Sequence, residues 1–275
     1  MFHPTFKLSE VLDAYRGANV FFNIVQIGAG GNGGYLVQRL TKLLHALSQK
    51  DITFSFTYKI VDGDAVEVKN LQRQPFIEDD VGMFKAQVLA ERYQSAYDGL
   101  PVLYKNEYVE TAKEIEQLVY MEQPIYKHHV PIILGCVDNN ATRQLIHEAF
   151  QKIPNCIYID SGIESMDEEG SDDSGYSGQV VCGAKIYNKQ YLEPIGEVYP
   201  NILEDKDSRL PTQACGEQVA NYPQRMQTNE TAALVMMGYL NTLLSEHALM
   251  SHYTNFNART MLIRPTYIQE GQVKS

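Results

Sequence analysis

The chain has 275 residues, a hydrophobic fraction of 44% and a formal net charge of -11, values that predict a globular protein with one large core. The acidic balance excludes a general nucleic-acid binder, which needs clustered lysines and arginines to neutralise phosphates. No stretch approaches the roughly 18 apolar residues of a membrane helix, and no basic region precedes an apolar run at the beginning, so we expect a cytoplasmic protein.

Short apolar runs alternate with longer amphipathic runs up to residue 160, which is typical of βαβ units around a mainly parallel sheet. The predicted strands are residues 21–27, 54–62, 101–106, 131–138 and 156–160. The predicted helices are residues 36–47, 84–97, 111–121 and 140–152. The run 131–138 is continuously apolar, so we expect this strand to be buried on both faces.

The pattern changes after residue 160. Residues 164–178 hold six carboxylates and no basic residue, which predicts a mobile loop that is a linker or a lid. A solvated charge run is the preferred interpretation, and docking of a basic partner is the alternative. The rest is predicted to be a strand at 179–187, irregular chain at 188–225, a long helix at 229–249 and a last strand at 259–265.

Residue types that bind metals are present but poorly spaced for a metal site. The cysteines are Cys136, Cys156, Cys182 and Cys215. They form no paired CxxC motif, so we expect reduced thiols and no structural zinc. His128 and His129, before Pro131, are interpreted as a loop pair because no third ligand has suitable spacing.

The stretch IVQIGAGGNGGYL, residues 24–36, runs from an apolar strand into a glycine loop. Gly28, Gly30 and Gly33 match GxGxxG between a strand and a helix, the context that this motif requires. Glycine permits the tight turn, lets the backbone approach phosphate oxygens and leaves the next helix N-terminus facing the anion. Asp62 ends the second strand, where it would bind ribose hydroxyls. These features fit NAD and ATP equally.

Charged residues further along the chain favour ATP. Phosphoryl or adenylyl transfer needs cations for the triphosphate and a carboxylate for Mg²⁺, which Arg73, Lys85 and Asp138 would provide. A hydride-transfer enzyme has no need of this set. Alternative roles are a solvated surface position for Lys85 and an N-cap of helix 140–152 for Asp138.

These residues resemble the ThiF/MoeB/ubiquitin-activating enzyme superfamily. The matching strings are Gly28-Ala29-Gly30-Gly31-Asn32-Gly33, Asp62-Gly63-Asp64, Asn70-Leu71-Gln72-Arg73-Gln74, Gly82 with Lys85, and Asp138-Asn139 with Arg143. The resemblance implies an α/β, Rossmann-like fold whose mainly parallel sheet has flanking helices, a few antiparallel strands and a crossover loop. It implies a single adenylation domain over 1–275, comprising a nucleotide-binding core at about 20–162, the acidic loop 164–178, a crossover loop at 188–225 and a C-terminal helix and strand at 226–275.

In that superfamily the site binds ATP and Mg²⁺ and adenylates the C-terminal glycine of a ubiquitin-like protein, with release of pyrophosphate. The positions that the resemblance assigns to ATP are Gly28, Gly30, Gly31, Gly33, Asp62, Asp64, Asn70, Arg73, Gln74, Lys85 and Asp138. Among them, Arg73 and Lys85 would stabilise the developing charge, and Asp138 would hold Mg²⁺.

The segment 213–233 resembles the part of the superfamily that carries a thioester-forming cysteine, with Cys215 followed by Pro223 and a helix. Cys215 would take the acyl group from the adenylate, and Arg209 or Arg225 would lower the pKa of its thiol. The acyl group would then pass to a conjugating-enzyme-like partner. In the alternative, the reaction ends at the adenylate, for sulfur transfer or a small-molecule or tRNA-linked carboxylate, and Cys215 is dispensable.

The size of the chain is similar to that of compact bacterial ThiF-family proteins of PRTRC-type gene systems, and superfamily members are commonly homodimers. Tyr15-Arg16 is the one candidate for the arginine that some members supply to a partner subunit, with a packing or surface role as the alternative. Two other classes remain open: an NAD-dependent oxidoreductase, which would need only the glycines and Asp62, and a non-catalytic scaffold.

Overall fold

The computed structural model describes residues 4–12, 20–120, 128–167, 171–213 and 224–273. The strands are β1 (Phe6–Lys7), β2 (Val20–Ile27), β3 (Ser55–Val61), β4 (Val102–Lys105), β5 (His128–Gly135), β6 (Cys156–Ile163), β7 (Ser177–Ile186), β8 (Lys189–Leu192), β9 (Ala248–Leu249), β10 (Ser251–Asn257) and β11 (Leu262–Tyr267). The helices are α1 (Leu8–Val11), α2 (Gly31–Lys50), α3 (Lys85–Ala96), α4 (Ala112–Tyr120), α5 (Asn140–Lys152), α6 (Ile195–Val198), α7 (Asn201–Glu204), α8 (Met226–Glu246) and α9 (Glu270–Val273), with 3-10 turns η2 (Val68–Asn70) and η3 (Glu78–Asp80). No helix in these ranges is both long and apolar enough to cross a membrane.

The main sheet of the described residues has the strand order β11-β10-β7-β6-β5-β2-β3-β4, and β8 pairs with β7. The strands from β4 to β6 along this order are parallel. From β7 onwards the pairing is antiparallel. The predicted Rossmann-like α/β fold, with a mainly parallel sheet and an antiparallel extension, is therefore confirmed.

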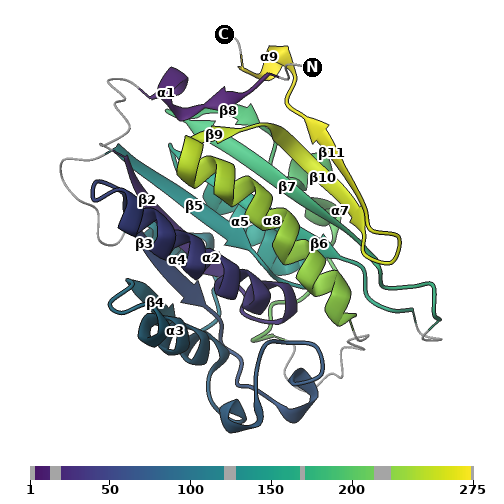
Figure 1. Cartoon of the computed structure of the whole chain (residues 1–275). Coiled ribbons are helices and arrows are strands. Elements are labelled where there is room, and N and C mark those ends of the chain that lie inside the picture. Colours follow the sequence, from purple (N-terminus) through teal and green to yellow (C-terminus); the bar gives the residue numbers. More distant parts are fainter. Residues whose placement is uncertain (1–3, 13–19, 121–127, 168–170, 214–223, 274–275) are drawn as a thin grey trace.

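Helices cover both faces of the sheet. On one face α2 and α8 lie side by side, with α3 next to them, and on the other face lie α4 and α5 (Figure 1). Strand β2 shows why the predicted strands are continuously apolar. Phe22 and Ile24 belong to the hydrophobic core on the α2 and α8 face of the sheet, whereas Val25 and Ile27 belong to the core on the α4 and α5 face. Because a strand alternates sides, burial on both faces requires an apolar residue at almost every position.

The prediction that His128 and His129 form a loop is wrong. Strand β5 begins at His128, and these two residues pair in parallel register with Val20 and Phe21 of β2. The ring of His129 stacks on Phe21, with 6.1 Å between the ring centroids. Burial lowers the pKa of His129 to about 4, so at neutral pH the ring is uncharged and fits an apolar edge of the sheet.

The predicted last strand, residues 259–265, corresponds to β11 (Leu262–Tyr267), but the prediction starts it three residues too early. The structure places a turn at residues 258–261, between β10 and β11, and Met261 in this turn has a φ of 58°. The predicted helix 229–249 begins earlier, at Met226, and ends where His247 takes up the left-handed conformation. The stretch 188–225, predicted to be irregular, contains the short elements β8, α6 and α7.

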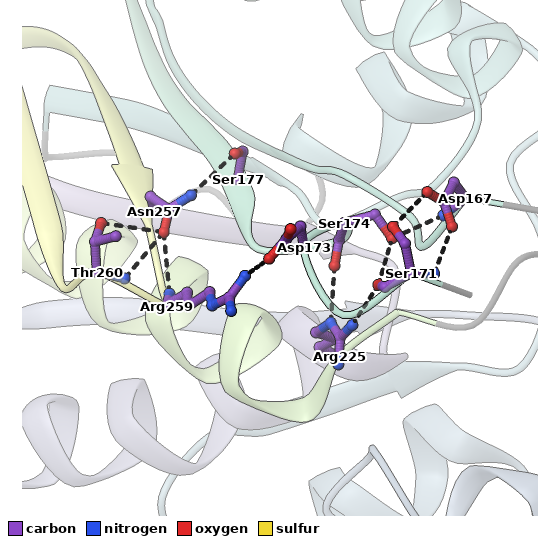
Figure 2. A network of polar contacts seen from close by, with 9 residues as sticks. All are labelled: Asp167, Ser171, Asp173, Ser174, Ser177, Arg225, Asn257, Arg259 and Thr260. Carbon is purple, nitrogen blue, oxygen red and sulfur yellow. Dashed lines mark hydrogen bonds and ion pairs between the residues drawn. The ribbon is translucent and has the colours of Figure 1, made fainter. Parts of the chain in front are cut away.

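The described part of the acidic loop is tied to two arginines that come from elsewhere in the chain (Figure 2). Arg225 precedes α8 and donates from Nε to the Ser174 carbonyl at 2.8 Å and from Nη2 to the Ser171 carbonyl at 3.0 Å. Its guanidinium lies 4.2 Å from the centre of the Tyr176 ring. Arg259, from the β10–β11 turn, pairs with Asp173. The cations that neutralise the negative charge of this loop therefore come from outside it and could not be predicted from the loop sequence alone.

We predict that Arg225→Ala lowers the free energy of unfolding by about 2 kcal/mol, because it removes two charge-assisted hydrogen bonds and a cation–π contact. The matched variant Arg259→Ala should cost no more than about 1 kcal/mol, because its ion pair is exposed. Urea unfolding of both variants tests this, and equal losses would contradict the assignment of Arg225 as the stronger tie.

Candidate active site

At the end of β2, the backbone of the glycine loop is in direct contact with the end of β3 and with the residue that follows β5. The Gly28 amide donates to the Val61 carbonyl at 2.9 Å, and the Cys136 amide donates to the Ile27 carbonyl at 2.8 Å. A Cβ atom on Gly28, whose φ is 98°, would lie 2.4 Å from the carbonyl oxygen of Cys136. A Cβ on Gly33 would lie 2.3 Å from the Gly28 carbonyl oxygen. Both glycines are therefore needed for close approach of the backbone.

Gly30 has a different role from these two glycines. It is the N-cap of the 20-residue helix α2, and a Cβ built on it would meet nothing closer than Gln74 Nε2 at 3.7 Å. Gly30, Gly31 and Asn32 all border a cavity. The positive end of the α2 dipole and its free N–H groups therefore face an open space, an arrangement suited to an anion such as phosphate.

Gln26 holds the glycine loop in this shape, a role that the sequence analysis missed. Its fully buried side chain donates from Nε2 to the carbonyls of Gly28, at 2.8 Å, and Gly33, at 3.0 Å. The Tyr58 hydroxyl in turn donates to Gln26 Oε1 at 2.5 Å. A glutamine inside the apolar run FFNIVQI was the available signal, because a buried amide needs polar partners.

The cavity has a volume of about 420 Å³ and lies at the carboxyl ends of β2, β3 and β5, where open α/β sheets bind ligands. Of the residues predicted for the site, it is bordered by Gly28, Gly30, Gly31, Asp62, Asp64, Asn70, Arg73, Gln74, Lys85 and Asp138. Gly33 lies in the first turn of α2, against Gly28. Cys215, Pro223, Tyr15 and Arg16 lie outside the described residues.

Asp62 accepts hydrogen bonds from the backbone on both carboxylate oxygens. The Ala29 amide donates to Oδ2 at 2.6 Å, and the Asp64 amide donates to Oδ1 at 2.8 Å. Burial, with the nearby Asp64 charge, raises the pKa of Asp62 to about 6, although Lys85 and the two amides act in the opposite direction. Each oxygen keeps a second lone pair for a further donor, such as a ribose hydroxyl.

Lys85 is buried at the first position of α3 and pairs with Asp64, with 2.7 Å between Nζ and Oδ2. The Tyr108 hydroxyl donates to the other oxygen of this carboxylate. Burial raises the pKa of Asp64, but the Lys85 ammonium and the two hydrogen bonds outweigh it and hold the pKa below its usual value. Tyr108, which also borders the cavity, was missed by the sequence analysis because nothing in its local sequence marks it.

The NLQRQ string forms a compact turn beside the glycine loop. The Asn70 side chain accepts from the Glu67 amide at 2.8 Å, which fixes η2. Gln74 is buried, and its Oε1 has no partner among the described residues. The side chain of Arg73, half-buried on the cavity wall, has no ion pair or hydrogen bond to any described residue. This guanidinium is therefore available to an anionic ligand.

Asp138 follows β5 as an exposed residue on the cavity wall. It is not the N-cap of α5, because the cap is Asn139, whose side chain accepts from the Thr142 amide at 2.8 Å. Arg143 holds this loop in place: its Nη2 donates to the Val137 carbonyl at 2.6 Å, and its Nε donates to the buried Asp160 at 3.0 Å. Asp138 itself is exposed and borders the cavity.

A second cavity of about 400 Å³ adjoins the first. The residues that border both are Val137, Asp138, Ile163 and Gln224. Polar side chains from several elements border the second cavity, among them Asn140, Gln179 and Tyr199. Asp138 therefore borders both cavities.

The three cysteines that the structure describes are free thiols, as expected, and all three are buried. Burial raises the pKa values of the Cys136, Cys156 and Cys182 thiols well above their usual range. These thiols are packing groups rather than nucleophiles.

Comparison with known proteins finds a match to the family model described as ThiF family, over residues 20–269. Among solved structures the chain is similar to PaaA, with 16% identity and a TM-score of 0.58 over 90% of this chain and 64% of that one. It is similar to E. coli MccB with ATP, with 15% identity and a TM-score of 0.57 over 90% and 64%. It is also similar to E. coli MccB with AMPCPP and MccA, with 15% identity and a TM-score of 0.57 over 92% of this chain and 65% of that one. The chain thus spans just under two thirds of the length of these proteins, and the likeness shows a shared fold. No curated protein sequence matches the chain.

The raised pKa of Asp62 predicts a specific pH dependence of stability. Between the ordinary pKa of 3.8 and the folded value of about 6, the folded protein holds a proton that the unfolded chain has released. The free energy of unfolding should therefore fall as the pH rises through this window, by on the order of 3 kcal/mol. Asp62→Asn should remove this part of the slope, and urea unfolding between pH 4 and pH 7 measures it. Parallel pH profiles for the two proteins would contradict the assignment.

Proposed function

This chain belongs to the ThiF family, and from that premise we propose that it is an ATP-dependent adenylyltransferase that activates a carboxylate. The observation that carries the proposal is the composition of one cavity. A bare helix N-terminus, a ribose-binding candidate in Asp62 and Arg73, whose side chain has no partner among the described residues, border the same space as Asp138. E. coli MccB, which shares the fold, has been crystallised with ATP, and this supports the choice of nucleotide.

Each part of ATP has a counterpart in this cavity. Ribose hydroxyls would donate to Asp62, which is ionised above a pH of about 6. The phosphates would lie over Gly30 and the first turn of α2, where a side chain is absent and N–H groups are available. Arg73 would hold phosphate oxygens through its planar guanidinium.

Asp138 is the residue that fits Mg²⁺. Its carboxylate is exposed on the cavity wall and has no ion pair with any described residue. Mg²⁺ is usually bound by one or two carboxylates together with substrate phosphates and water, so a single aspartate at this place suffices. Bound there, Mg²⁺ would neutralise phosphate charge.

The reaction needs placement and cations rather than a protein base. An oxygen of the substrate carboxylate, which is already ionised at neutral pH, attacks the α-phosphorus. A new P–O bond forms, the bond from the α-phosphorus to the bridging oxygen breaks, and pyrophosphate leaves with the electron pair. Arg73 and the helix N-terminus would stabilise the charge that develops on the phosphates. The adjoining cavity, which Asp138 also borders, is where the substrate carboxylate would enter.

The finer form of the proposal is activation of the C-terminal glycine of a ubiquitin-like protein, followed by a thioester on Cys215 and transfer to a conjugating-enzyme-like partner. It rests on the family resemblance of the segment around Cys215 and on the burial of the three described cysteines, which leaves Cys215 as the candidate nucleophile. A homodimer belongs to the same proposal.

The alternative that ends at the adenylate shares the cavity and differs only in the role of Cys215. An NAD-dependent oxidoreductase, the alternative from another class, would use the glycines and Asp62. It leaves Arg73 and Asp138 without a function, although both border the same cavity. We therefore favour adenylation.

We predict substrate-dependent exchange of labelled pyrophosphate into ATP when the chain is mixed with Mg-ATP and a small protein ending in glycine that a neighbouring gene encodes. Arg73→Ala should lower the exchange rate about 100-fold, because a cation on the developing charge is lost. Arg259→Ala, the same change at a residue that borders neither cavity, should leave it unaltered.

Cys215→Ala should retain exchange but lose the thiol-sensitive adduct on a non-reducing gel. Exchange without an adduct in the unmodified protein would reject the thioester step and leave the adenylate-only reaction. An absence of exchange with every such protein, at saturating ATP, would reject adenylation of this substrate class.

A further inference from the structure

Arg209 borders the nucleotide cavity although it is remote in sequence from the glycine loop and the NLQRQ string. It lies in the stretch 205–213, which follows α7 and has no regular secondary structure beyond turns. Pro211, from the same stretch, also borders the cavity. One wall of the cavity is therefore built by chain that no nucleotide-binding motif includes.

The cations around the cavity divide into two classes. Lys85 pairs with Asp64 at 2.7 Å, and Lys69 pairs with Glu67 at 2.9 Å. Arg73 and Arg209 have no carboxylate partner within the described part of the chain. An unpaired arginine on a cavity wall is a ready anion contact, because its rigid fork of donors matches phosphate oxygens.

The stretch that carries Arg209 is firmly seated on α5. The next residue towards the N-terminus, Ser208, accepts from the Ala141 amide at 3.0 Å. Asp205 accepts from Asn140 Nδ2 at 2.7 Å and from the Ser208 amide at 3.0 Å. Gln144 Nε2 donates to the Asp205 carbonyl at 2.6 Å. The chain beside Arg209 is thus fixed to the helix that begins next to Asp138, and Arg209 itself is an exposed residue that borders the same cavity as Asp138.

We propose that Arg209 binds the β- and γ-phosphates of the nucleotide from this second wall, together with Arg73 from the first. This inference rests on the proposed use of a nucleoside triphosphate. Two guanidinium groups from separate parts of one chain then bind the phosphates that leave as pyrophosphate, so this role requires no arginine from a partner subunit.

The test compares the binding of ATP, AMP and inorganic tripolyphosphate by calorimetry, each with Mg²⁺. Arg209→Ala should weaken ATP and tripolyphosphate binding about tenfold to 100-fold and leave AMP binding unchanged, because AMP lacks the phosphates concerned. Arg209→Lys should recover part of the loss. The control Lys206→Ala removes an exposed cation from the same stretch, away from the cavity residues, and should bind all three as the unmodified protein does.

Unchanged ATP binding in Arg209→Ala would overturn the inference, and so would an equal loss of ATP and AMP, which indicates a structural role. The outcome is separate from that of the proposed function. If pyrophosphate exchange fails but ATP affinity depends on Arg209, adenylation of this substrate class is rejected and the Arg209 contact stands. If exchange occurs and Arg209→Ala binds ATP normally, adenylation stands and the Arg209 contact is rejected.

Discussion

The close approach of the β2 end, the β5 end and the first turn of α2 is the constraint on which the site depends. Gly28 and Gly33 leave room for carbonyl oxygens that a Cβ atom on either residue would meet at 2.4 Å and 2.3 Å. Gln26 completes the arrangement by bonding the carbonyls of both glycines. Because these backbones touch, Asp62 after β3 and Asp138 after β5 lie on the same cavity as the α2 N-terminus. The geometry of the site is thus set by backbone contact, and the charged side chains are added to it.

Charge is the second feature that shapes the cavity. A lysine at the first turn of a helix opposes the helix dipole, and a buried lysine needs a counter-charge. Lys85 is buried and lies in the first turn of α3. It is stabilised by an ion pair with Asp64, which also accepts a hydrogen bond from Tyr108. That pairing leaves Arg73 and Arg209 as the cavity cations without a described partner. The two lysines that border the cavity are therefore neutralised by carboxylates, and the two arginines are available to phosphates.

The parallel half of the sheet was predictable because each of its strands is an apolar run and each connection is an amphipathic helix. The antiparallel half was not. Strand β10 buries His252, Thr254 and Phe256 on one face, so two of its three inward residues are polar and no apolar run marks it. Strand β10 was therefore missed, and the predicted strand 259–265 corresponds to its neighbour β11 with a start three residues too early. The prediction of a loop at His128 failed for the same reason, because this polar residue begins an otherwise apolar strand.

The candidate site divides along similar lines. The glycines, Asp62, Arg73 and Asp138 belong to local motifs and were identified from spacing, although Asn139 rather than Asp138 caps α5. Arg209 reaches the cavity through tertiary contacts of an irregular stretch, which no local pattern encodes. The central claim, that this cavity holds a nucleoside triphosphate, is tested most directly by calorimetric titration of the unmodified protein with Mg-ATP and, separately, with NAD. The account predicts binding of one Mg-ATP per chain and none of NAD; saturable binding of NAD without binding of Mg-ATP would contradict it.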